Sequence, residues 1–134
     1  MSTIQITKPK VDISPSILND LKTQIHEAGQ VVIHFLFQND YWIGTKIRIW
    51  PTSYLYDQGS SHISDLVHCE NIVQAPMWQD VVYGDQCHFT LIFSGLPRDC
   101  RTFDFIEDCG TEGGGFSVKD IARNEADIYY FRID

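Results

Sequence analysis

From Gln30 onward, apolar and polar positions alternate with a period of two along most of the chain. The clearest run is Cys87–Phe93, where Phe89, Leu91 and Phe93 occupy every second position. Successive side chains of a strand point to opposite faces, so this period predicts strands with one face in a core. The pattern therefore indicates an all-β fold.

Turn signals divide the alternating region into about eight short strands. We predict strands at Val31–Phe37, Trp42–Trp50, Ser53–Tyr56, Ile63–Ile72, Cys87–Phe93, Thr102–Asp108, Phe116–Ile121 and Ile128–Phe131. Both faces of the first strand are largely apolar, so we expect it at the centre of a sheet or beneath a helix. Short strands separated by turns in this number are typical of an antiparallel β-sandwich.

A helical period occurs once, before the strands begin. Ser14 is a good N-cap, Pro15 suits the first helical position, and Gly29 can adopt the left-handed conformation that ends a helix. The apolar stripe between them consists of Ile17, Leu18, Leu21 and Ile25. We predict one short N-terminal helix over Ser14–Ala28 that packs on an open part of the sandwich.

Composition and charge narrow the class of protein. Of the 134 residues, 43% are hydrophobic and 13% aromatic, which is enough for one core, and no linker divides the chain. We therefore expect a single domain over residues 1–134. The net charge is −8 and no basic stripe is present, so neither nucleic acid nor an anionic membrane is an expected partner. The start of the chain lacks the apolar core of a secretory signal, which predicts a cytoplasmic location.

Two runs of residues carry a resemblance to a known domain. They are FTLIFSGLP at Phe89–Pro97 and FDFIE at Phe103–Glu107. The region that contains them, Val31–Ile121, resembles an uncharacterised immunoglobulin-like β-sandwich domain of bacterial proteins, some of which carry it before a thioredoxin-like domain. The resemblance implies an immunoglobulin-like sandwich with a binding or accessory role, and it implies no catalytic residue. This chain departs from the longer arrangement because it contains no C-x-x-C motif.

The four cysteines are Cys69, Cys87, Cys100 and Cys109. Without a secretory signal, reduced thiols are the expected state. Cys100 and Cys109 flank a predicted strand and are too far apart for a disulfide. Whether Cys69 and Cys87 pair stays open.

Two groups of residues suggest a metal site at first. His68-Cys69 and Cys87-His88 can each offer only one ligand to a common ion, because neighbours in a strand point to opposite faces. Two ligands are too few for structural zinc. The second group is acidic and consists of Asp104, Glu107, Asp108 and Glu112. It lacks the spacing of a calcium loop. We expect no metal and no cofactor, and leave open whether residues 104–112 bind a cation.

No arrangement of residues predicts nucleophilic catalysis. Ser94 does not lie in a G-x-S-x-G motif, and no histidine has a recognisable triad context. Cys100 lies between Arg98 and Arg101, which would lower its pKa, although Asp99 partly offsets them. We assign no catalytic residue. A reactive Cys100 and a small enzyme with a site built from scattered polar residues are kept as alternatives.

Aromatic residues in predicted loops are the best candidates for a binding site. They are Trp42, Trp78 and Tyr83. Such rings can anchor a protein partner or stack on a sugar. The alternative for Trp42 and Trp78 is that they close the ends of the core, and Trp50, within a strand, is expected in the core. We therefore expect a non-catalytic binding or protein-interaction module for an unknown protein or small-molecule partner, with sugar binding as an alternative.

Overall fold

The computed structural model describes residues 3–5, 29–39, 44–110 and 115–133. This part of the chain consists of strands, turns and irregular segments, and contains no helix. The helix predicted over Ser14–Ala28 lies outside the described residues, and so does Trp42. Within the described ranges, no helix is both long and apolar enough to cross a membrane.

The described part of the chain contains ten strands. They are β1 (Thr3–Gln5), β2 (Val31–Gln38), β3 (Thr45–Ile47), β4 (Ser53–Asp57), β5 (Ile63–Glu70), β6 (Gln79–Val81), β7 (Gln86–Phe93), β8 (Thr102–Glu107), β9 (Ser117–Ala122) and β10 (Ile128–Ile133). Eight of them form one sheet in the order β1-β10-β2-β7-β5-β4-β8-β9, while β3 and β6 form a separate ladder. The all-β prediction is confirmed for these residues.

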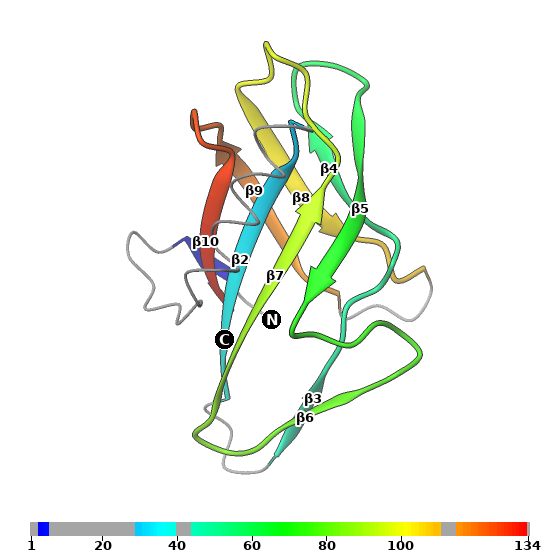
Figure 1. The fold of residues 1–134 in the computed structure, drawn as a ribbon, viewed down its shortest axis with the longest axis vertical. Helices are drawn as coiled ribbons and strands as arrows, with labels where there is room; N and C mark the ends of the chain where they lie inside the picture. The colour runs from blue at the N-terminus through cyan, green and yellow to red at the C-terminus, as the bar shows by residue number, and fades with distance from the viewer. Residues whose placement is uncertain (1–2, 6–28, 40–43, 111–114, 134) are drawn as a thin grey trace.

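The eight-stranded sheet curls so that its two halves face each other. Figure 1 shows β10, β2, β7 and β5 in front and β4, β8 and β9 behind them. The edge strands β1 and β9 also lie close to each other, so the sheet is strongly curled. One continuous sheet that curls in this way encloses a core much as two stacked sheets would.

The prediction that the sheet is entirely antiparallel is wrong at one pair. β10 runs parallel to β2, with Phe131 opposite Phe35, so the sheet is mixed. The other pairs of the sheet are antiparallel. A parallel pair needs a long connection, and residues 39–127 lie between these two strands. The alternation of apolar and polar residues within a strand carries no information about whether it runs parallel or antiparallel to its neighbour.

The core is rich in phenylalanine. The Phe35 side chain is fully buried, and its ring centroid lies 5.1 Å from that of Phe89, 5.4 Å from that of Phe105 and 6.0 Å from that of Phe131. These rings come from four strands in both halves of the curled sheet, and such pairs add to the free energy of burial. The predicted inward faces of the strands are therefore confirmed at these positions.

The strand predicted over Trp42–Trp50 is shorter in the structure. β3 ends at Ile47, and beyond it Ile49 forms an isolated parallel bridge with Gln74. The side chains of Arg48 and Trp50 are half-buried rather than in the core. The expectation that Trp50 is a core residue is therefore wrong.

Candidate functional site

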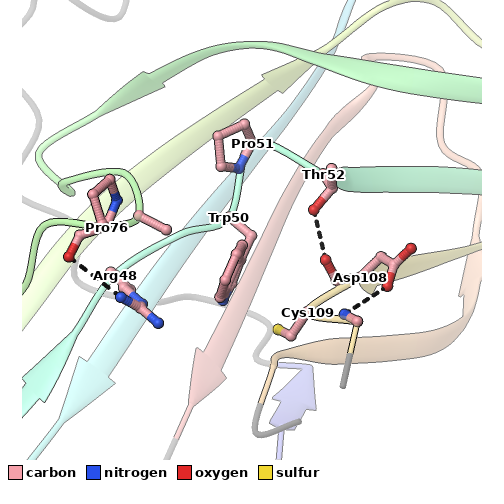
Figure 2. A pocket seen from close by; sticks show the side chains of 9 residues that line it. Arg48, Trp50, Pro51, Thr52, Pro76, Asp108 and Cys109 are labelled. Carbon is pink, nitrogen blue, oxygen red and sulfur yellow. Dashed lines mark hydrogen bonds between the residues drawn. The ribbon is translucent and has the colours of Figure 1, made fainter. Parts of the chain in front are cut away.

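The candidate site lies where the chain leaves β3 and enters β4. A pocket of about 620 Å³ opens there between this segment, the loop before β6 and the residues that follow β8. Its lining residues are Arg48, Trp50, Pro51, Thr52, Ala75, Pro76, Asp108, Cys109 and Gly110. Figure 2 shows the Trp50 ring between the Arg48 and Pro76 side of the pocket and the Asp108 and Cys109 side.

Arg48 joins two tryptophans at the edge of this pocket. Its Cζ atom lies 3.8 Å from the ring centroid of Trp78 and 4.8 Å from that of Trp50. Its Nη1 atom also donates a hydrogen bond of 3.3 Å to the carbonyl of Pro76. A guanidinium is planar and attracted to aromatic faces, so it can hold both rings in place. We refer to Arg48, Trp50 and Trp78 as the stack.

A buried carboxylate fixes the backbone beneath the stack. Glu107 Oε2 accepts a hydrogen bond of 2.7 Å from the Trp50 amide, and Oε1 accepts one of 2.8 Å from the Phe116 amide. Burial raises the pKa of Glu107, while these amides and the charge of Arg48 lower it. A Cβ atom at Gly115 would lie 3.0 Å from Glu107 Oε1, so glycine leaves room for this arrangement. Glu107 therefore acts as a clamp between the segments that lead into β4 and β9.

The opposite side of the pocket is held by local hydrogen bonds. Thr52 Oγ1 donates a hydrogen bond of 2.5 Å to the Asp108 carbonyl, and the Gly110 amide donates one of 2.9 Å to Asp108 Oδ1. The Asp108 side chain is exposed, whereas Cys109 is buried. The pocket therefore combines aromatic and proline surfaces with an arginine at one side and a carboxylate at the other.

Exposed apolar side chains flank β6 on both sides. Met77 and Trp78 precede the strand, and Val82 and Tyr83 follow it. Trp78 is 53% exposed and Tyr83 is 61% exposed. Tyr83 lies in the turn that follows β6, and the printed ring contacts of Arg48 are with Trp50 and Trp78, so Tyr83 is not counted in the stack. Trp78 and Tyr83 are candidates from the sequence alone, whereas Arg48 is not, because an arginine next to a strand has no sequence signature of stacking.

The cysteines are all free in the structure. The strand register places Cys69 opposite Leu91, four residues from Cys87 on β7. Four residues of strand span roughly 13 Å, which is too far for a disulfide. The open question of a Cys69–Cys87 pair is thereby answered in the negative.

Cys100 does not have the environment of a reactive thiol. Burial, followed by the hydrogen bond and the negative charge of Asp57, raises the pKa of Cys100 to about 11. Its neighbours in sequence, Arg98 and Arg101, are exposed and do not offset this effect. The thiolate is the nucleophilic form, so both the raised pKa and the burial of Cys100 disfavour the alternative of a reactive Cys100.

No group of three or more metal-ligating side chains occurs among the described residues. His68 Nε2 lies 2.5 Å from Glu70 Oε1, at an exposed position. Asp104 accepts hydrogen bonds from the Gln58 side chain and the Asp120 amide. Both oxygens of Glu107 already accept backbone hydrogen bonds, so Asp104 and Glu107 help to hold the fold, while Glu112 lies outside the described residues.

One serine and one histidine lie within hydrogen-bond distance of each other. His62 Nε2 is 3.0 Å from Ser64 Oγ, and both groups contact the carbonyl of Gly95. The Ser64 side chain is fully buried and its hydroxyl donates to that carbonyl. A nucleophile must reach its substrate, so this pair has a structural role.

Comparison with protein-family models, with curated proteins and with solved structures gave no significant match to this chain. The site is therefore interpreted from its own geometry and chemistry.

Proposed function

We propose that this protein is a non-catalytic module that binds a protein partner at the stack and its adjoining pocket. The observation that carries the proposal is the state of Trp78, whose ring is half exposed and yet held at 3.8 Å by Arg48. An indole that is already positioned loses little conformational entropy when a partner covers it. Tryptophan and arginine are also the side chains that most often dominate binding energy at interfaces.

The pocket and the charge of the chain support the same proposal. The pocket offers about 620 Å³ beside an exposed aromatic ring, which suits an anchoring side chain of a partner. The net charge of −8 favours association with a partner that presents basic residues. We therefore expect the partner surface to combine an apolar anchor with lysine or arginine.

A peptide-display selection tests this function even though the identity of the partner is open. Peptides are selected on the full chain and counter-selected on the Trp78→Ala variant. We expect peptides with an aromatic or apolar anchor and basic residues, whose affinity falls at least tenfold on Trp78→Ala, because a central interface tryptophan contributes about 2 kcal/mol or more. Ile63→Ala, which truncates an exposed side chain on β5, serves as the control and should leave the affinity unchanged.

Thermal unfolding of the same variants separates binding from folding. Trp78→Ala should leave the free energy of unfolding within about 1 kcal/mol of the wild-type value, because the ring is half exposed. Failure to enrich any peptide that distinguishes the wild-type chain from Trp78→Ala would contradict the proposal. A large loss of stability in Trp78→Ala would assign the tryptophan to the core instead.

A carbohydrate is the second candidate ligand. The pocket places the exposed carboxylate of Asp108 and the hydroxyl of Thr52 near the ring of Trp50. Aromatic surface next to hydrogen-bonding groups is a combination that suits sugars. A sugar that displaces the selected peptides at millimolar concentration would favour this candidate.

Two further proposals concern the location of the protein in the cell and its relationship to a known domain. We propose a cytoplasmic location, which the four free cysteines support because thiols stay reduced there. We also propose that the curled sheet is a variant of the immunoglobulin-like sandwich of bacterial proteins. That relationship depends on the Phe89–Pro97 and Phe103–Glu107 runs of the sequence.

A further inference from the structure

A second pocket, of about 390 Å³, lies where the turn before β8 meets the residues that follow β9. Its lining includes three arginines, Arg98, Arg101 and Arg123, and two carboxylates, Glu125 and Asp127. This concentration of arginine stands out in a chain with 10 basic and 18 acidic side chains.

Arg123 forms a fixed wall of this pocket. Its Nε and Nη2 atoms donate to the two oxygens of Asp127 at 2.6 and 2.9 Å. Its Nη1 atom donates to the carbonyls of Pro97 and Cys100 at 2.7 and 3.3 Å. These bonds neutralise Asp127 and hold the turn that carries Arg98. The backbone around the pocket is therefore positioned before any ligand arrives.

Arg98 and Arg101 differ from Arg123 in their exposure and their contacts. Both side chains are exposed, and the described part of the chain offers neither of them a hydrogen bond or an ion pair. The Cys100 amide donates to the Pro97 carbonyl at 3.0 Å, and this turn places both arginines at one pocket. Since Asp127 is already paired, Glu125 is the carboxylate of the lining that opposes them.

We propose that this pocket binds the phosphate group of a small molecule through Arg98 and Arg101. Guanidinium groups donate paired hydrogen bonds that match the oxygens of a phosphate. The thiol at the pocket adds no negative charge near neutral pH, because burial and Asp57 raise the pKa of Cys100 to about 11. The site is separate from the stack, so it is independent of the proposed protein partner.

Inorganic phosphate is the probe for this site. The full chain, labelled with ¹⁵N, is titrated with phosphate at constant ionic strength set by chloride, so that general screening is unchanged. We expect saturable shifts of the amides at Arg98, Arg101 and Arg123. Arg98→Gln and Arg101→Gln should each weaken binding at least fivefold, since a hydrogen bond to a charged group is lost.

Two matched variants distinguish phosphate binding at this pocket from a general attraction of phosphate by the positive charges of the protein. Lys119→Gln removes one exposed positive charge on β9 that is not part of the pocket lining, and should change the affinity less than twofold. Glu125→Gln removes the opposing carboxylate and should tighten binding severalfold. A gain of affinity cannot arise from a damaged fold.

Three results would overturn the proposal. They are shifts that do not saturate, equal losses of affinity in Lys119→Gln and Arg101→Gln, and weaker binding by Glu125→Gln. None of these results bears on the peptides selected at the stack, so the two proposals fail separately.

Discussion

Replacing Phe35 by alanine should lower the free energy of unfolding by about 3 to 5 kcal/mol. The ring is fully buried and contacts aromatic rings on β7, β8 and β10. Its removal leaves a cavity between the two halves of the curled sheet, which the surrounding backbone fills only in part. Urea denaturation of the wild-type and variant chains measures the loss.

Tyr83→Ala is the matched aromatic control for this prediction. The tyrosine ring is 61% exposed after β6, so its truncation should change the free energy of unfolding by about 0.5 kcal/mol or less. A loss below about 1 kcal/mol for Phe35→Ala would mean that the two halves of the sheet do not share one core. Equal losses of unfolding free energy in Phe35→Ala and Tyr83→Ala would contradict the burial of Phe35 and the exposure of Tyr83.

Acidification from pH 7.5 to 4.5 should cost about 2 to 3 kcal/mol of stability through His34 alone. The imidazole on β2 is 1% exposed, shares a hydrogen bond of 2.8 Å with Thr90 Oγ1, and stacks on the ring of Tyr130. Burial lowers the pKa of His34 from 6.5 to about 4, because the charged ring would lose its hydration.

Stability falls as the pH falls because His34 is protonated more readily in the unfolded chain than in the folded one. Between pH 6.5 and 4, the unfolded chain binds a proton at this histidine and the folded chain does not. The contribution of the neutral, buried ring is therefore complete above about pH 6.5 and is lost as the pH falls toward 4.

Comparison with His34→Gln isolates this effect from the titration of carboxylates. The variant cannot bind a proton at position 34, so its unfolding free energy should fall less steeply between pH 6.5 and 4.5 than that of the wild type. Denaturation at a series of pH values, roughly 0.5 apart, gives both curves. Parallel curves would show that His34 is charged in the folded state or exposed to water.

Much of the fold is predictable from the sequence because burial follows the period of a strand. The alternation over Cys87–Phe93 predicts β7 to within one residue, and Val31–Phe37 predicts β2 equally well. β6 escapes prediction because it has three residues, of which Val81 alone is buried. The parallel pairing of β10 with β2 escapes because it is a property of the connection between strands and not of either strand.

The candidate site is predictable only in part. A tryptophan in a loop-like stretch after Pro76 marks Trp78 as a candidate, but the sequence cannot show that Arg48, far earlier in the chain, lies against it. The register of β3 and β6 brings these two segments together. The structural role of Glu107 also escapes prediction, because its partners are backbone amides, which every residue except proline carries.

The indole N–H resonances of the three tryptophans test most directly whether the stack is a binding surface. A peptide selected on the full chain is added to the ¹⁵N-labelled protein, and the resonances are assigned with single tryptophan-to-phenylalanine variants. We predict a saturable shift of the Trp78 resonance, because the peptide covers the exposed part of that ring, and a smaller shift of the Trp50 resonance at the pocket. A Trp78 resonance that does not move while the peptide binds would contradict the account.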